Sequence, residues 1–499
     1  MPQTYGTIIS TFESPSTRKF SFVLNKDVII HRGQFVQLDT HEGKLIGRVS
    51  DILRTNKYFN RPESVSDVQN TGGQMDWHYP VWEHEYLVAE AKPLGVFNSG
   101  KFKESTFPVS PGSHVYEPDL TILTQFFGFD QNGIHLGKLK YHDVDVKLNM
   151  TKLFQKHLAI LAISGSGKSY SIAVMLEELL NRKPENGQLG VIVIDPHGEY
   201  SSLIKDASFA DKIKVFQSND IRIGVSNLSP YQLAKFVPGL VSPAQTRELA
   251  RIMREMPKNY GIQELITALE EDEKIKAATK DVLVSLLYNL QSTGVFGVAD
   301  YPTLKDVSEQ GKVSIIDLSH VVSLNKKQIL VSYLASKLFD ARRHGVIPPF
   351  LLVIEEAHQF APEGSKKDSS ISKSIIETIA REGRKFNACL CLISQRPAQL
   401  STTALSQCNT NFIFRVTNPY DLKHIQESSE GITYDVVKQI SSLPVGTGLI
   451  VGEAVSFPVF VDIRQRQIKE GQKGQSLEEA AKEYKKMMKQ EKEDAKAFM

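Results

Sequence analysis

The 499-residue sequence has little cysteine, little tryptophan and no long apolar run. Its three cysteines, Cys389, Cys391 and Cys408, offer neither a disulfide framework nor a metal-ligand set. No uninterrupted apolar stretch approaches the ~18 residues of a transmembrane helix, and the N-terminus has no basic region followed by an apolar core. These absences argue against the disulfide-rich secreted and membrane-spanning classes. We therefore expect a cytoplasmic protein that has no membrane partner.

An excess of charge of either sign is also missing. The 59 Lys and Arg residues against 57 Asp and Glu residues leave a formal net charge of +2. Any contact with nucleic acid must therefore come from local basic patches, because there is no strong overall field. The length predicts two or three domains, and contents of 41% hydrophobic and 23% charged residues are those of a soluble globular protein.

The clearest pattern that is present runs from residue 158 to residue 180. An apolar run at 158–163 predicts a short buried strand, a Gly/Ser loop follows, and SIAVMLEELL then has apolar residues at helical spacing. Strand, loop, Lys-Ser and helix in this order predict a phosphate-binding loop for ATP, in which Lys168 reaches the β- and γ-phosphates and Ser169 holds Mg²⁺. The predicted nucleotide contacts are Ser164, Gly165, Ser166, Gly167, Lys168, Ser169 and Tyr170. Ala162 stands where the pattern has its first glycine, and the alternative is a chance turn before a helix.

Two further apolar runs end in acidic residues. GVIVID, at 190–195, predicts a strand of a parallel sheet that ends in Asp195. Asp195, His197 and Glu199 then either contact metal or water beside the phosphates, or belong to a plain turn around Pro196 and Gly198. The residues leave both readings open.

The second run, at 350–354, ends in Glu355 and Glu356. In a phosphate-loop ATPase the first acid supports Mg²⁺ and the second orients the attacking water. Glu355 stands where Asp is commoner, which makes its metal role the less secure of the two. The alternative is a pair of surface acids after a strand.

The remaining segments complete an α/β fold. Residues 1–145, including strand-like pieces up to 133–139, predict a small N-terminal β-barrel. Residues 146–465 predict a RecA-like phosphate-loop ATPase core with a helical insertion at about 225–310 and a closing β-pair at 446–464. Residues 466–499 predict a C-terminal helical tail, with a capping box formed by Ser476 and Glu479.

A polar loop at 363–373 follows the acidic strand end. Its Lys366 and Lys367 are candidates for contacts with DNA phosphates, and a merely solvated loop fits the sequence equally well.

The ordered motifs AISGSGKS, DPHGEY, VIEEAH, AREGRK and ISQRP resemble the HerA branch of the HerA–FtsK ATPases. The resemblance covers roughly the whole chain. It implies a hexameric, Mg²⁺-dependent ATPase that pumps duplex DNA through a ring, with a NurA-type nuclease as partner, for end resection in recombinational repair.

The same resemblance implies roles for three more residues. Gln395 would sense the γ-phosphate, and Arg381, or Arg384 as the second choice, would enter the nucleotide site of the neighbouring subunit. Both arginines could instead be ordinary exposed helix residues, or one could bind DNA. The rival functions are a conjugation- or secretion-type pump and a nucleotide-gated scaffold that recruits a nuclease.

Overall fold

The computed structural model describes residues 2–10, 14–59, 61–70, 72, 81–236, 242–364, 370–429, 432–467, 478–479 and 481–485. Contacts divide the chain into two compact units. The first unit comprises Met1–Asn149 and Thr447–Arg464, and the second comprises Met150–Gly446 and Gln465–Met499. The domain boundaries expected from the sequence, 1–145, 146–465 and 466–499, stay a prediction.

The first unit contains a closed six-stranded barrel, as the sequence predicts. Its strands, in the order in which they pair, are β2 (Phe20–Leu24), β1 (Thr4–Ile9), β7 (His114–Tyr116), β3 (Phe35–Thr40), β4 (Gly43–Asn56) and β5 (Glu85–Asn98). The pairing of β2 with β5 closes the ring. In β2 the side chains of Phe20, Phe22 and Leu24 are buried and alternate with less buried ones, because successive residues of a strand face opposite sides.

Three short elements of the first unit lie outside the six barrel strands. Helix α1 (Pro62–Asn70) lies between β4 and β5, β6 (Lys101–Lys103) pairs with β5, and α3 (Leu120–Phe127) follows β7. The sequence pattern had suggested strands without an intervening helix, so α1 and α3 are departures from it.

The strand expected at 133–139 exists, but its place in the barrel was wrong. Strand β8 (Ile134–Leu139) pairs with β9 (Asp145–Leu148) and with β20 (Val459–Ile463), and β20 pairs with β19 (Thr447–Gly452). The closing β-pair of the sequence prediction is therefore confirmed. Its partner β8 is more than 300 residues away, a distance over which no local pattern can indicate pairing.

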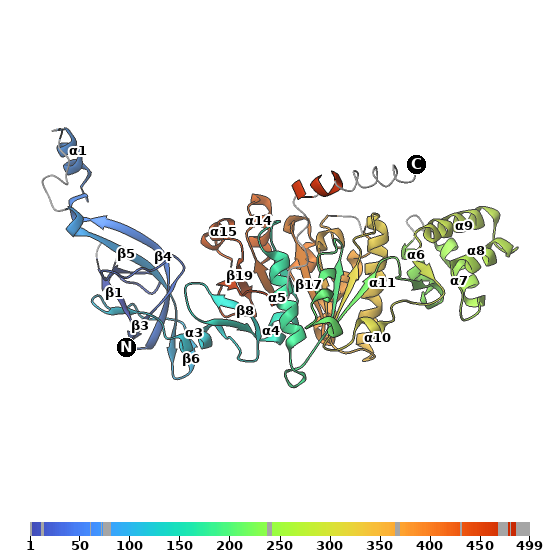
Figure 1. Cartoon of the computed structure of the whole chain (residues 1–499), viewed down its shortest axis with the longest axis horizontal. Helices are drawn as coiled ribbons and strands as arrows, with labels where there is room; N and C mark the ends of the chain where they lie inside the picture. The colour runs from blue at the N-terminus through green and yellow to red at the C-terminus, as the bar shows by residue number, and fades with distance from the viewer. Residues whose placement is uncertain are drawn as a thin grey trace, which may run out of the picture. The chain divides into compact units, whose positions relative to one another are not determined.

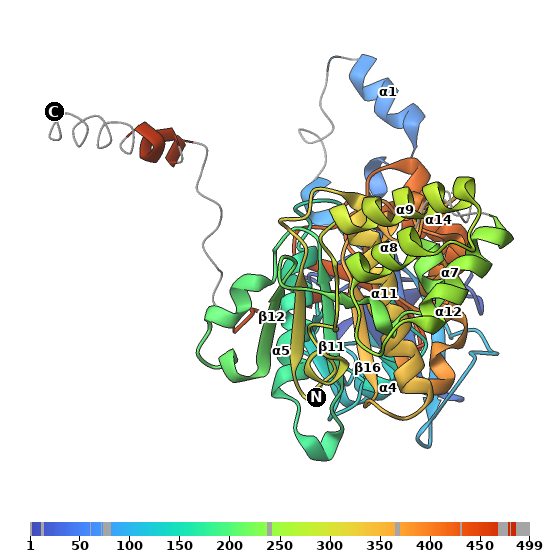
Figure 2. The ribbon, with the colours of Figure 1, turned by 90° about the vertical axis from the view of Figure 1, so that its right-hand side faces the viewer.

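The second unit is built on a parallel sheet. Its strands, in spatial order, are β12 (Ile213–Gln217), β15 (Val313–Asp317), β11 (Gly190–Asp195), β16 (Phe350–Ile354), β17 (Ala388–Ser394), β10 (Leu158–Leu161) and β18 (Thr410–Ile413). Each of these strands pairs with its neighbours in parallel. Helices α5 (Lys168–Asn181), α11 (Leu324–Arg343) and α12 (Lys373–Glu382) flank the strands, as Figure 2 shows. Since the strands are parallel, the loops after their C-terminal ends share one edge of the sheet.

The helical insertion is confirmed. It consists of α6 (Pro230–Phe236), α7 (Pro243–Glu255), α8 (Ile262–Glu271) and α9 (Ala277–Ser292), which gather in one cluster in Figure 1. At the start of α7, Ser242 accepts hydrogen bonds from the amides of Ala244 and Gln245 and completes a capping box with the Gln245 side chain. The short strands β13 (Ile223–Gly224) and β14 (Phe296–Gly297) pair at the base of the insertion.

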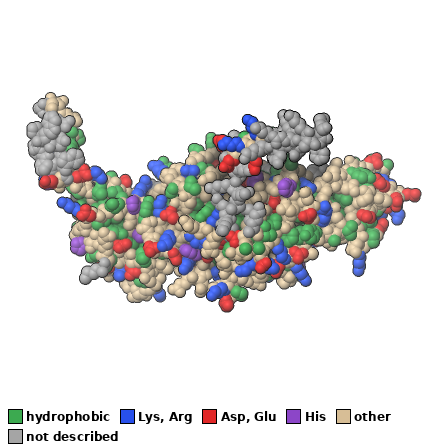
Figure 3. Space-filling view, viewed as in Figure 1, with side chains coloured by type: hydrophobic (Ala, Val, Ile, Leu, Met, Phe, Trp, Pro, Cys, Tyr) green, Lys and Arg blue, Asp and Glu red, His purple; other side chains and the backbone are tan. Residues whose placement is uncertain are grey.

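The C-terminal half differs from the sequence prediction in small ways. The strand expected at 409–418 is shorter and ends at Ile413. Asn418 is already the N-cap of helix α14 (Pro419–Ser428), and α15 (Tyr434–Ser441) follows. The described tail residues, 478–479 and 481–485, are helical as expected, whereas Ser476 of the predicted capping box lies outside the described residues. On the face drawn in Figure 3, side chains of both charges are intermixed. Within the described parts, no helix is long and apolar enough to cross a bilayer.

Candidate nucleotide-binding site

The loop between β10 and α5 has the backbone of a phosphate cradle. Gly165 and Gly167 have φ of 73° and 102°, a region that side chains rarely adopt. A Cβ on Gly167 would lie 3.2 Å from the amide nitrogen of Gly446, which itself donates to the Ser166 carbonyl at 3.3 Å. The Ser166 hydroxyl in turn donates to the carbonyl of Ile163 at 2.7 Å. Ser166 is therefore held by Ile163 and Gly446, and the positive φ of Gly167 together with the close approach of Gly446 favours glycine at that position.

Helix α5 begins directly at Lys168, with Gly167 as its N-cap and no side-chain cap. The first amides of a helix have no intrahelical partners, and together with the helix dipole they favour an anion at this end. Ala162 is fully buried, and its amide donates to the Ser394 carbonyl at 3.2 Å, which extends the pairing of β10 with β17. Ala162 thus fits the first position of the loop without strain.

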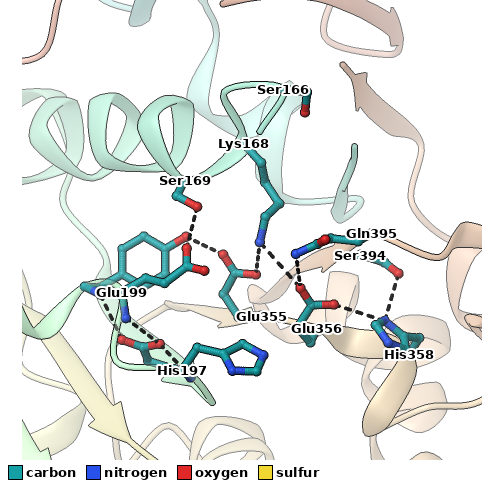
Figure 4. Close-up of polar contacts among 12 residues, drawn as sticks. Ser166, Lys168, Ser169, His197, Glu199, Glu355, Glu356, His358, Ser394 and Gln395 are labelled. Atoms are coloured by element: carbon teal, nitrogen blue, oxygen red, sulfur yellow. Dashed lines mark hydrogen bonds and ion pairs between the residues drawn. The ribbon is translucent and has the colours of Figure 1, made fainter. Parts of the chain in front are cut away.

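Lys168 contacts both acids of the predicted pair. Its ammonium nitrogen lies 2.7 Å from Oε2 of Glu355 and 3.7 Å from Oε1 of Glu356, and all three side chains are buried (Figure 4). Burial alone lowers the pKa of Lys168, but the charge and hydrogen bond of Glu355 outweigh it, so the pKa is raised. Lys168 therefore carries a positive charge and lies between two carboxylates beside the loop.

The loop after β11 is organised by Asp195. The Asp195 carboxylate accepts hydrogen bonds from the amides of Gly198, Glu199 and Tyr200 at 2.8, 3.1 and 2.9 Å, and from that of His197 at 3.3 Å. This geometry is that of the turn, one of the two readings left open by the sequence. A metal role for Asp195 stays a prediction.

The same loop touches two residues of the predicted site. The buried Tyr200 hydroxyl donates to Oε1 of Glu355, and the Ser169 hydroxyl donates to a carboxylate oxygen of Glu199. Among the described residues there is no group of three or more His, Cys, Asp or Glu side chains arranged to hold a metal. Mg²⁺ binds with substrate phosphates and only one or two protein ligands. A metal role for Ser169 and Glu355 stays a prediction.

Glu356 is held at both carboxylate oxygens. Gln395 Nε2 donates to Oε1 at 2.6 Å, and Nδ1 of His358 lies 3.3 Å from Oε2 (Figure 4). Glu356 also has a φ of 49°, a left-handed conformation that is uncommon for a residue with a side chain. The sequence pointed to Glu356 and Gln395, but not to Tyr200 or His358. The only sequence signal for these two residues was that Tyr200 lies in the motif DPHGEY and His358 in the motif VIEEAH.

Arg381 and Arg384 lie away from the Lys168 of their own chain. Both are exposed, Arg381 in the last turn of α12 and Arg384 just before β17. The carbonyl of Ala380 contacts Nε2 of His157 at 3.0 Å, at the start of β10, whereas Lys168 follows the end of that strand. The two arginines are thus at the opposite edge of the parallel sheet from the phosphate loop.

The other predicted residues are placed as follows. Ser164 and Gly165 are exposed at the tip of the loop. The Tyr170 hydroxyl accepts a hydrogen bond from the amide of Arg466 at 2.8 Å, and the guanidinium group lies 5.2 Å from the ring centroid. The predicted DNA contacts Lys366 and Lys367 lie outside the described residues.

Comparison with known proteins places this chain in a family. Residues 134–338 match the family described as the central domain of helicase HerA. A probable DNA double-strand break repair helicase HerA of Methanocaldococcus jannaschii is 32% identical in an alignment of 447 positions that covers 77% of this chain and 86% of that protein. The chain belongs to the HerA family of helicases. The DNA double-strand break repair helicase HerA of Pyrococcus furiosus is 26% identical to this HerA-family chain in an alignment of 515 positions that covers 90% of each protein.

One solved structure supports the fold of this HerA-family chain. VirB4 of Thermoanaerobacter pseudethanolicus matches with a TM-score of 0.52 and 16% identity, over 67% of this chain and 97% of VirB4. At that identity the likeness extends to the fold alone.

Proposed function

We propose that this HerA-family protein is an ATP-driven DNA helicase that translocates on duplex DNA and works at DNA ends in recombinational repair. The observation that carries the proposal is the convergence of Lys168, Glu355, Glu356 and Gln395, from three segments of the chain, on one point beside the phosphate loop. The names of the M. jannaschii and P. furiosus relatives, both double-strand break repair helicases, support the DNA substrate and the process.

In the proposed reaction the loop amides and Lys168 bind the triphosphate of ATP. When ATP binds, the γ-phosphate competes with Glu355 for the ammonium group of Lys168, because the phosphate carries more negative charge than the carboxylate. Glu356 takes the proton of the attacking water, and Gln395, hydrogen-bonded to Glu356, lies where it can respond to the presence of the γ-phosphate. Ser169, with Glu355 and Glu199, would hold Mg²⁺, which neutralises charge that develops on the phosphates.

The positions of Arg381 and Arg384 favour a ring of subunits. Neither can reach the phosphate loop of its own chain across the sheet, so a finger role requires another copy. An arginine supplied in trans is worth about 10³–10⁵ in turnover, which makes hydrolysis depend on the neighbour. We propose a homo-hexamer, with Arg381 as the finger and Arg384 as the second choice.

The DNA contact is proposed to be independent of sequence. Phosphate contacts fix a protein on the duplex without reading bases, and the candidate contacts are Lys366 and Lys367, which follow Glu355 and Glu356 in the sequence. Because the net charge is only +2, binding rests on such local groups and weakens steeply with salt. A NurA-type nuclease is the proposed partner for end resection.

The test is ATP turnover of the full chain with no DNA, with linear duplex and with closed circular duplex, at two salt concentrations. Displacement of a short third strand from the duplex measures translocation, and native mass with and without an ATP analogue measures the ring. The proposal expects turnover that rises with linear duplex, falls with salt and accompanies third-strand displacement. Turnover that ignores DNA would favour a pump of another substrate, and stable nuclease binding with no turnover would favour the scaffold.

A further inference from the structure

His358 connects the acid Glu356 to the end of strand β17. It lies two residues after Glu356, in the short helix Ala357–Gln359, and its side chain is only 12% exposed. Nδ1 lies 3.3 Å from Oε2 of Glu356 and 3.1 Å from the hydroxyl oxygen of Ser394 (Figure 4). One ring nitrogen therefore faces both groups.

Ser394 is itself fixed. It is the last residue of β17, is fully buried, and its hydroxyl oxygen accepts a hydrogen bond from the amide of Arg396 at 3.0 Å. Gln395, the next residue, holds the other oxygen of Glu356. The end of β17 thus reaches both oxygens of the carboxylate, once directly through Gln395 and once through His358.

The contact between His358 and Glu356 depends on which ring nitrogen of His358 carries the hydrogen. A carboxylate only accepts hydrogen bonds, so the contact with Glu356 is favourable when Nδ1 of His358 carries the hydrogen. Each carboxylate oxygen has two lone pairs, so Glu356 can accept from Gln395 and His358 and still accept from a water molecule. The backbone of Glu356, at φ 49°, is in a left-handed conformation that side chains rarely adopt and that persists only when the surroundings hold it.

We propose that His358 is a positioning residue, whose Nδ1–H fixes Oε2 of Glu356 so that the carboxylate is aimed at the attacking water. The proposal rests on the proposed function, in which Glu356 is the base in ATP hydrolysis. A base that is oriented by a third group is the usual arrangement where proton transfer must be accurate. Without the contact with His358, the Glu356 carboxylate keeps its charge but is no longer held in one orientation.

The test compares three substitutions of His358 in the full chain. Asparagine places its amide nitrogen close to the position of Nδ1, glutamine places it close to that of Nε2, and alanine removes both. His358→Asn is expected to keep kcat within about threefold of the unchanged protein. His358→Gln and His358→Ala are expected to lower kcat about 10- to 100-fold, the effect of a misplaced catalytic group, with KM for ATP changed less than about twofold.

The controls distinguish a misplaced Glu356 carboxylate from a less stable protein. Asparagine and glutamine are both polar amides, so a loss of stability alone would affect the two variants alike, and the thermal midpoint of each is measured. His344→Ala, at an exposed histidine whose ring contacts its own helix at the Asp340 carbonyl, is expected to behave as the unchanged protein.

Equal kcat in the Asn and Gln variants, or faster turnover in the Ala variant, would overturn the positioning role. Absence of ATP turnover in the unchanged protein would refute the proposed function itself, and the role of His358 with it. Full activity of His358→Ala in an active background would refute the positioning role alone.

Discussion

Gln395 Nε2 lies 2.6 Å from Oε1 of Glu356, although the two residues are 39 positions apart in the sequence. They meet because β16 and β17 are parallel neighbours, with Ile354 opposite Leu392, so that the residues after both strands emerge at the same edge. The contact therefore follows from the order of the strands.

Removal of the Gln395 amide should slow hydrolysis without preventing ATP binding. In Gln395→Ala, Glu356 loses its donor at Oε1, and we expect kcat to fall about 10²-fold, as when one polar group is removed from a reaction site. Fluorescent-nucleotide binding should stay within a few-fold. Gln399→Ala, an exposed position in the same segment, is the control, and a Gln395→Ala enzyme with normal turnover would contradict the sensor role.

Lys168→Ala should lose both ATP binding and stability. It removes the proposed phosphate ligand and leaves two buried acids without their cation, and breaking such a buried ion pair typically costs about 3–5 kcal/mol. The double variant Lys168→Ala with Glu355→Gln should regain much of the thermal midpoint but none of the ATP binding. If the double variant is no more stable than the single one, the ion pair of Lys168 with Glu355 is not the reason for the loss.

Arg381 should act on a neighbouring subunit. Arg381→Ala alone and Glu356→Gln alone are expected to be inactive, and mixed rings should recover part of the turnover, because some sites then combine an intact Glu356 with an intact arginine. Mixing with Arg384→Ala in place of Arg381→Ala tests the second choice. No recovery at any mixing ratio would exclude Arg381 as a trans finger.

His157 should make the second unit sensitive to mild acid. Nδ1 of His157 accepts from the amide of Leu390 at 3.0 Å while Nε2 contacts the carbonyl of Ala380, and burial lowers the pKa of this histidine to about 4. Because the folded pKa lies below the ordinary value of about 6.5, the stabilisation is complete above pH 6.5 and is lost as the pH falls towards 4.

Between pH 7 and pH 5 the loss attributable to His157 should be about 2 kcal/mol. The measurement is the free energy of unfolding in urea for the unchanged protein and His157→Gln at both pH values. The variant should be the less stable protein at pH 7, and the gap should narrow at pH 5. A gap that is independent of pH would mean that His157 is not held neutral.

The sequence was sufficient to predict features that are formed by residues close together along the chain. The apolar run before Ser164 and the acids after Ile354 predicted two strand ends, and both strands and the loop between β10 and α5 are found as expected. The glycines also indicated the loop, since Gly165 and Gly167 adopt the positive φ that the loop requires.

The sequence was insufficient where contacts depend on the order of strands. Nothing near His358 indicates that Ser394 lies beside it, because only the adjacency of β16 and β17 brings them together. The pairing of β8 with β20 was missed for the same reason. For Asp195 the residue type suggested a metal ligand as readily as a turn, and only the positions of four backbone amides show what its carboxylate accepts.

The most direct test is the turnover of Glu356→Gln compared with its affinity for ATP, both measured in the presence of linear duplex DNA. If Glu356 takes the proton of the attacking water beside the loop that binds the triphosphate, the variant binds ATP within about twofold of the unchanged protein and hydrolyses it about 10²–10⁴-fold more slowly. Near-native turnover of Glu356→Gln would contradict the account.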